Sequence, residues 1–153
     1  MHLLLAIDHS DSAERAVQEV LRRPWPRELH VRVLSVMDKD PGSSPADVPV
    51  PSAPVGEVPP WPAGTLATRG VLDANARHLA EATAHRLAAQ GLRTEACVRE
   101  GTAGSEIIDT AHGWPADLIV VGSRGLGPIK RLLLGSVATY VVHHAHCSVL
   151  VVR

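Results

Sequence analysis

The sequence predicts an α/β fold, with an open parallel sheet of five strands and helices on both of its faces. Apolar runs of strand length alternate with segments of helical periodicity, which is the pattern of a parallel sheet joined by right-handed crossovers. Two runs, residues 2–7 and 118–121, are almost continuously apolar, as expected of strands buried on both faces. Residues 92–98 alternate apolar and polar side chains, which favours an edge strand. The strand order 3-2-1-4-5 satisfies these observations.

Length and composition limit the classes of protein to consider. A chain of 153 residues predicts a single domain over residues 1–153, and the absence of Phe predicts an aliphatic core. A formal net charge of −1 without any Lys/Arg block argues against a nucleic-acid partner. No apolar run approaches the roughly 18 residues of a membrane span, and no secretory leader is apparent. We therefore expect a cytoplasmic protein with no membrane partner.

The first part of the chain is predicted to form a strand, a helix and a second strand. Residues 2–7 form the first strand, which ends at Asp8. Asp11 and Glu14 have the spacing of a capping box for the helix that follows. The apolar face of this helix comprises Ala13, Val17, Val20 and Leu21. Residues 30–36 carry three valines and form the second strand.

The middle of the chain is expected to be irregular and then helical. Residues 38 to about 68 lack apolar periodicity, and eight of the twelve prolines lie between Pro41 and Pro62. Such a Pro-rich insert is expected to lack regular structure, and it serves either as a lid over the site or as a plain loop. The longest helix follows, and Gly91 is placed to end it. Its apolar stripe is Leu72, Ala76, Leu79, Ala80, Thr83 and Leu87.

The last part of the chain contains the most informative stretch. A short helix within residues 101–112 precedes the buried strand 118–121. Glycines follow this strand at positions 122, 125 and 127, and Gly135-Ser136 then begins a segment of helical periodicity. The apolar positions of that segment are Val137, Tyr140, Val141 and His144. Residues 148–152 form a final strand.

A strand followed by a glycine loop and a helix start predicts an anion site. Glycine lets backbone N–H groups approach a ligand, and a helix N-terminus adds unpaired donors and partial positive charge, which together suit a phosphate. Open α/β sheets bind ligands at the carboxyl ends of the strands that flank the switch point. Asp8 and Gly122 are therefore expected to meet there. The alternatives are that Asp8 only caps a helix and that the glycines only turn the chain.

The spacing Gly122-x-x-Gly125, nine further residues and then Gly135-Ser136 resembles the nucleotide-binding signature of the universal stress protein family. It is neither a Walker A loop nor a dinucleotide-binding fingerprint. The segments LLAIDHSDSA, EGTAGSEIIDTA and HCSVLVV resemble family blocks too, and only residues 38 to about 68 fall outside the resemblance. The resemblance implies a Rossmann-like fold with the same strand order and, in the ATP-binding branch, a bound ATP. Mg²⁺ is expected to accompany it.

The resemblance also implies roles for individual residues. The glycines and the Gly-Ser pair would hold the phosphates and ribose, Asp8 would contact the nucleoside, and the backbone of Val36 would face the adenine. The implied nucleotide-binding residues are Ala6, Ile7, Asp8, Val36, Gly122, Ser123, Arg124, Gly125, Gly135, Ser136 and Val137. No catalytic residue or metal ligand is implied.

Three functions fit this pattern. The favoured one is a stress-response or signalling regulator that binds an adenine nucleotide without efficient turnover. The second is a slow ATPase or adenylyl-transferring enzyme on the same site, although no nucleophile and base are paired by spacing near the loop. The third is a dimer module without nucleotide. A homodimer is expected in any case, because the last strand is apolar on both faces at Val149, Leu150, Val151 and Val152, and an uncovered edge strand exposes unpaired backbone groups.

Overall fold

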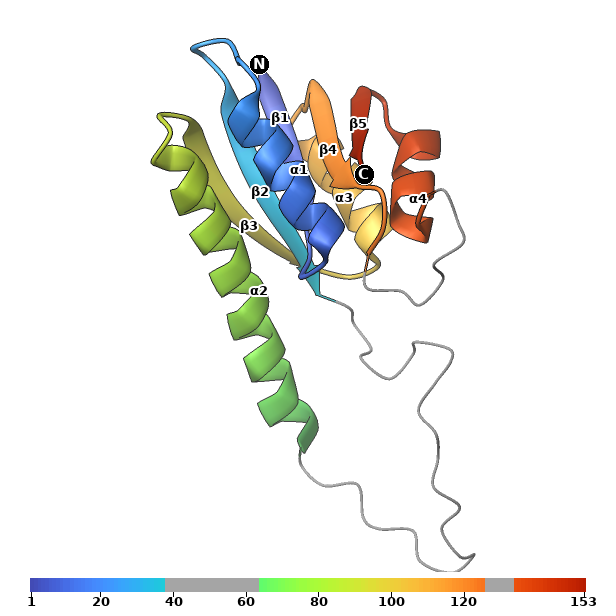
Figure 1. Ribbon diagram of the computed structural model, residues 1–153. Helices are drawn as coiled ribbons and strands as arrows, with labels where there is room; N and C mark the ends of the chain where they lie inside the picture. Colours follow the sequence, from blue (N-terminus) through green and yellow to red (C-terminus); the bar gives the residue numbers. More distant parts are fainter. Residues whose placement is uncertain (38–63, 126–133) are drawn as a thin grey trace, which may run out of the picture.

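The computed structural model describes residues 1–37, 64–125 and 134–153, with side chains of the second helix described from residue 73 onward. Strands and helices alternate along these residues (Figure 1). The elements are β1 (His2–Ile7), α1 (Asp11–Arg22), β2 (His30–Met37), α2 (Gly64–Ala88), β3 (Arg93–Glu100), α3 (Ala103–Gly113), β4 (Leu118–Gly122), α4 (Ser136–His144) and β5 (Ser148–Val152). None of the helices in the described residues has the length and hydropathy that a bilayer crossing needs.

The five strands form one parallel sheet in the order β3-β2-β1-β4-β5. In its register, Leu3 of β1 lies between Val31 of β2 and Leu118 of β4. The predicted fold class and strand order are confirmed. The point at which the chain reverses its direction of winding lies between β1 and β4.

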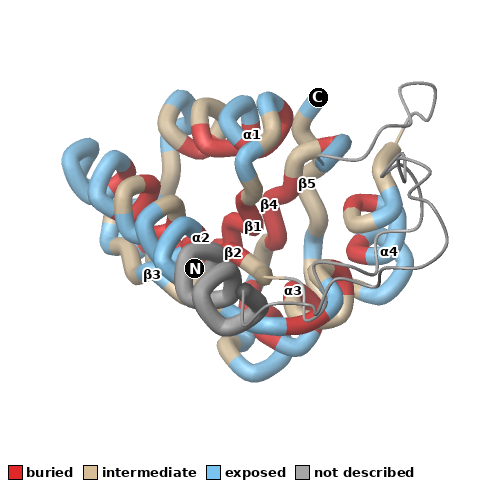
Figure 2. The backbone as a smooth tube through the Cα atoms, turned by 90° about the horizontal axis from the view of Figure 1, so that it is seen from below, coloured by how far each residue is buried: buried red, intermediate tan, exposed pale blue. Residues whose placement is uncertain are grey.

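The sheet separates two aliphatic cores (Figure 2). Successive residues of a strand point to opposite faces, so Leu3, Leu5 and Ile7 pack with α1 and α2. Leu4 and Ala6 pack with α3 and α4 on the other face. Both faces of the central strands are thus covered, which explains why their sequences are continuously apolar.

Two local predictions are wrong. The helix α1 is capped by the Ser10 hydroxyl, which accepts the Ala13 N–H, and not by an Asp11–Glu14 box. Glu14 instead binds the Arg86 guanidinium of α2 at 2.6 and 2.9 Å; the hydrogen bonds from Arg86 lower the pKa of Glu14 to about 2. The helix α2 begins at Gly64, so residues 64–68 of the predicted insert are helical. The rest of the insert lies outside the described residues.

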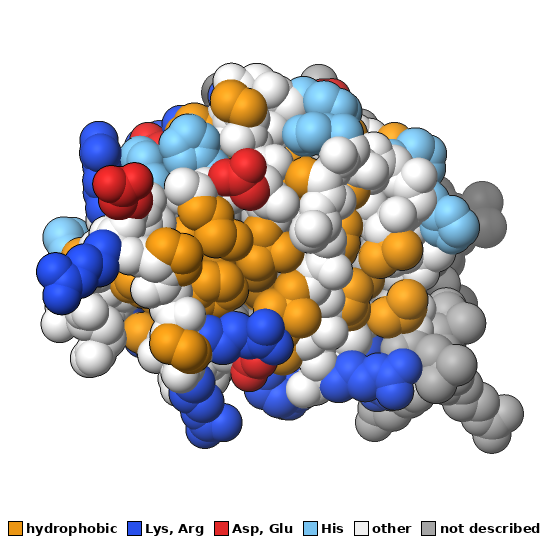
Figure 3. Space-filling view, turned by 90° about the horizontal axis from the view of Figure 1, so that it is seen from above, with side chains coloured by type: hydrophobic (Ala, Val, Ile, Leu, Met, Phe, Trp, Pro, Cys, Tyr) orange, Lys and Arg blue, Asp and Glu red, His pale blue; other side chains and the backbone are white. Residues whose placement is uncertain are grey.

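A cluster of aromatic and charged side chains lies at the amino ends of the strands, the end of the molecule seen in Figure 3. The His2 ring stacks on Trp114 at 4.6 Å, and the Arg32 guanidinium lies 4.4 Å from the centre of the Trp114 ring. The His30 ring meets Trp114 edge-on at 5.2 Å. Burial lowers the pKa of His30 despite the opposing effect of the Glu95 carboxylate.

The lowered pKa of His30 predicts a loss of stability in mild acid. As the pH falls through about 6.5, the unfolded chain takes up a proton at this position before the folded chain does, so the free energy of unfolding decreases. Urea unfolding at pH 7.5 and pH 5.5 should show a larger loss for the wild type than for His30→Gln. Equal losses in the two proteins would show that His30 titrates normally.

Candidate functional site

Asp8 directly follows β1 and is half-buried at the carboxyl end of the sheet. Its Oδ1 accepts the Ser10 N–H at 3.0 Å and also the Ser10 hydroxyl. No hydrogen bond joins its Oδ2 to the described residues. Asp8 is not the N-cap of α1, because Ser10 has that role. Among the described residues, nothing therefore competes with a ligand for this carboxylate oxygen of Asp8.

The turn after β4 is held against the first turn of α1. A Cβ on Gly122 would lie 2.7 Å from both the carbonyl carbon and Oγ of Ser12. The Ser12 hydroxyl donates to the Arg124 carbonyl and accepts the Arg124 N–H at 3.3 Å. The Ser123 N–H donates to the Val152 carbonyl at 2.6 Å. Gly122 is therefore required for the packing of α1 on β4, whether or not a ligand binds.

The next two glycines connect this turn with Asp8 and α4. A Cβ on Gly125 would lie 3.1 Å from Asp8 Oδ2, and a Cβ on Gly135 would lie 3.6 Å from the Gly125 nitrogen. The Gly135 N–H donates to the Ser123 carbonyl at 2.7 Å. Neither glycine has a positive φ, so both serve close approach and not a left-handed turn. Asp8 and the glycine loop meet as the strand order predicts, while Gly127 lies outside the described residues.

The helix α4 presents an uncapped N-terminus to this loop. It begins at Ser136, and its N-cap Gly135 supplies no side chain to the first turn. That turn contains no acidic residue. The first N–H groups of a helix have no intrahelical partner and carry partial positive charge. This helix start can therefore bind an anion through its backbone and the Ser136 hydroxyl.

The remaining predicted nucleotide-binding residues lie on both faces of the sheet. Ala6, Val36 and Val137 belong to the core on the α3 and α4 face, next to the start of α4. Ile7 packs in the core on the α1 and α2 face, so its backbone, but not its side chain, can contribute to the same site. Val121, near the end of β4, also packs on the α3 and α4 face. It was not among the site residues predicted from the sequence, although its position just before Gly122 at the end of a buried strand could have indicated it.

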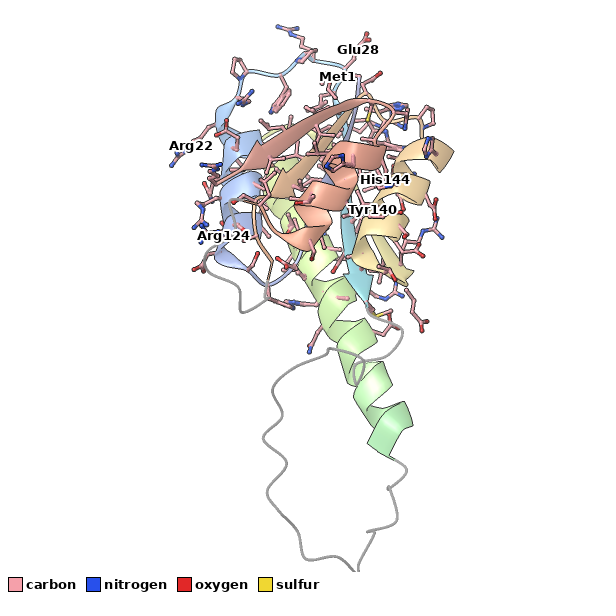
Figure 4. All side chains as sticks on the ribbon, turned by 90° about the vertical axis from the view of Figure 1, so that its right-hand side faces the viewer. Met1, Arg22, Glu28, Arg124, Tyr140 and His144 are labelled. Atoms are coloured by element: carbon pink, nitrogen blue, oxygen red, sulfur yellow. The ribbon has the colours of Figure 1, made fainter. Side chains whose placement is uncertain are left out.

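Two cavities lie beside this arrangement. One of about 190 Å³ includes Asp8, His9, Glu14 and Arg86 in its lining and lies between α1 and α2. The other, of about 200 Å³, is lined by Arg15, Ser123, Arg124 and Arg153. The side chain of Arg124 lies near the beginning of α1 in Figure 4. The sequence did not indicate Arg15 or Arg153, because no local spacing connects α1 with the end of β5.

These features define an open, doubly wound α/β protein with a candidate anion site at its topological switch point. Residues 1–153 match the family model of the universal stress protein family. The chain belongs to this family, and the resemblance carried by the glycine spacing is confirmed.

Relatives from this family align with different lengths of the chain. Universal stress protein Sll1388 of Synechocystis is 41% identical over 78 residues, which cover 51% of each chain. A universal stress protein of Mycolicibacterium smegmatis is 30% identical and matches 99% of this chain but 47% of its own length. The chain thus spans about half the length of these two relatives. Universal stress protein YxiE of Bacillus subtilis is 27% identical, with 99% of this chain and 97% of YxiE covered.

Solved structures share the fold over the whole chain. UspA from Lactobacillus plantarum is 27% identical with a TM-score of 0.70, covering 100% of this chain and 97% of its own. An Arabidopsis thaliana family protein with AMP bound is 21% identical with a TM-score of 0.68, covering 99% and 90%. An Archaeoglobus fulgidus universal stress protein in complex with dAMP is 18% identical with a TM-score of 0.61, covering 100% and 98%.

The contacts of the two loop glycines predict different effects on stability. In Gly122→Ala the new methyl group meets Ser12 backbone at 2.7 Å, and such overpacking costs about 1–3 kcal/mol. In Gly125→Ala it meets only the end of the Asp8 carboxylate at 3.1 Å, which can rotate away. Thermal melting without ligand should therefore show a clear loss for Gly122→Ala and little change for Gly125→Ala. Equal melting temperatures would refute the packing role of Gly122.

Proposed function

We propose that this chain is an adenine-nucleotide-binding universal stress protein, which binds ATP with Mg²⁺ between β1 and β4 and acts as a stress-response or signalling regulator. In this proposal the nucleotide is a bound ligand whose occupancy alters the contacts of the protein, and it is not efficiently turned over. The phosphates lie at the glycine loop and the start of α4, and the nucleoside lies toward Asp8 and Val36.

One observation carries the proposal: a free carboxylate oxygen and an uncapped helix start meet on one glycine loop. Asp8 Oδ2 lies 3.1 Å from the position of a Cβ on Gly125, and the N-cap Gly135 lies against the same loop. A nucleotide needs both features, because its ribose hydroxyls donate hydrogen bonds and its phosphates accept them. Gly125 leaves open the space between the two.

The relatives support the choice of ligand. A structural neighbour from Arabidopsis thaliana has AMP bound, and one from Archaeoglobus fulgidus is in complex with dAMP. Both ligands consist of an adenine, a sugar and a phosphate. A triphosphate carries more charge than the helix start and Arg124 can offset, which is the reason for including Mg²⁺. Among the described residues, no group of three or more His, Cys, Asp or Glu side chains could hold a metal ion by itself, so the phosphates would supply its ligands.

Two substitutions should weaken nucleotide binding to different extents. Ser136→Ala removes one hydrogen bond to a charged group, worth roughly 1.5–3 kcal/mol or about ten- to a hundredfold in affinity. Gly125→Val places a branched side chain against Asp8 Oδ2 and should abolish binding. Calorimetric titration with Mg-ATP measures both effects.

Ser148→Ala, at the opposite end of the sheet, is the matched control and should bind like the wild type. An absence of heat and of thermal shift in the wild type at millimolar Mg-ATP would refute the proposal. Equal, negligible effects of the two site substitutions would remove the glycine loop from the site.

We further propose that the protein is a homodimer through β5, which lies at an edge of the sheet. The Val152 carbonyl accepts the Ser123 N–H, so the backbone of Val152 faces the sheet. Backbone groups of successive strand residues point to opposite sides, so the N–H of Val151 points away from the sheet. An edge of this kind can pair with the same strand of a second copy.

Val151→Pro tests the dimer without disturbing the sheet. Proline removes the outward N–H of Val151, whereas the pairing of β5 with β4 uses other groups, and proline is tolerated at sheet edges. Light scattering should show a dimer for the wild type and a monomer or aggregate for Val151→Pro. Val151→Ala keeps the N–H and serves as the control. A dimer that survives Val151→Pro would place the interface elsewhere.

A further inference from the structure

The cavity lined by Arg15, Ser123, Arg124 and Arg153 gathers positive charge from three separate parts of the chain. Arg15 is in the second turn of α1, Arg124 is in the glycine loop, and Arg153 follows β5. All three arginines are exposed, and they border one space of about 200 Å³. In a chain with a formal net charge of −1, this is a local concentration of positive charge.

These charges are not neutralised by the described residues. Arg23, Arg32, Arg77 and Arg86 each form an ion pair, but none is found for the three arginines of the cavity among the described residues. Two acidic neighbours of Arg15 on α1 are engaged elsewhere, since Glu14 binds Arg86 and Glu19 binds Arg23. The third, Asp11, forms no ion pair with Arg15.

The Ser123 hydroxyl in the lining of the same cavity is also available to a ligand. Ser123 is 3% exposed and contributes to the lining. Its side chain forms no hydrogen bond with any residue that the structure describes, although its backbone N–H and carbonyl are both used. A ligand with acceptor atoms would satisfy this hydroxyl and the three guanidinium groups together.

The cavity and the proposed nucleotide crevice lie toward opposite faces of the sheet. Val152, the residue before Arg153, packs with the core under α1 and α2. Ala6, Val36 and Val137, which are proposed to border the nucleotide, pack with the core under α3 and α4. The loop segment Ser123–Arg124 lies between the two regions.

We propose that this cavity is an anion site, which binds a phosphate-type oxyanion through Arg15, Arg124, Arg153 and the Ser123 hydroxyl. The planar guanidinium group donates paired hydrogen bonds that match phosphate oxygens. The phosphate comes either from a free anion, independently of the nucleotide crevice, or from the terminal phosphates of a nucleotide in that crevice. The second source rests on the proposed function.

The test is calorimetric titration with sodium tripolyphosphate. The double variant Arg15→Gln/Arg153→Gln should bind it roughly ten- to a hundredfold more weakly than the wild type. The matched control is Arg22→Gln/Arg27→Gln, which removes the same charge from exposed arginines outside the cavity lining and should change the affinity less than twofold. Equal weakening in both variants, or no binding to the wild type at millimolar tripolyphosphate, overturns the proposal.

Parallel titrations with AMP and Mg-ATP distinguish the two sources. If the phosphate belongs to a nucleotide, the double variant should bind Mg-ATP more weakly but AMP normally, and Mg-ATP should displace tripolyphosphate. If the anion is free, tripolyphosphate should bind in the presence of saturating AMP, and the affinity for Mg-ATP should not change. Tripolyphosphate binding without any nucleotide binding would refute the proposed function and leave the anion site in place.

Discussion

The close contact of Gly122 with Ser12 is the constraint on which the rest of the site depends. Because Gly122 has no side chain, the first turn of α1 can lie directly on the end of β4. The Ser12 hydroxyl then binds the backbone of Arg124 and fixes the path of the loop. That path brings Gly125 next to Asp8 and Gly135 next to Arg124. One missing methyl group thus sets the positions of a carboxylate, a glycine loop and a helix start from distant parts of the chain.

The sheet gives this site two unlike sides. Alternate residues of β1 face α1 and α2 on one side of the sheet and α3 and α4 on the other. The loop at the strand ends therefore has a different pair of helices on each side. The side of α4 offers an uncapped helix start next to apolar side chains, which suits a nucleotide. The side of α1 offers exposed guanidinium groups and the Ser123 hydroxyl, which suit a small anion. Both follow from one strand pairing, that of β1 with β4.

The sequence was sufficient for the fold, and it predicted that Asp8 and the glycine loop would lie together at the strand ends. Continuous apolar runs marked the central strands, and the glycine spacing marked the loop and the start of α4. What it could not supply depended on contacts between distant residues. The capping box at Asp11 and Glu14 had correct spacing, but Arg86 of another helix binds Glu14. Arg15 and Arg153 meet only through the packing of α1 beside β5. Gly122 was expected to leave room for a ligand, and the close approach of Ser12 to it is a second role that the sequence did not indicate.

The cluster around Trp114 has a consequence for how the protein can be observed. Of the three tryptophans, Trp114 is stacked against His2 at the amino ends of the strands, and Trp25 donates its indole N–H to the Val20 carbonyl near the end of α1. Both indoles are therefore at the opposite end of the sheet from Asp8 and the glycine loop. Their intrinsic fluorescence responds to the loosening of that end and is insensitive to occupancy of the crevice.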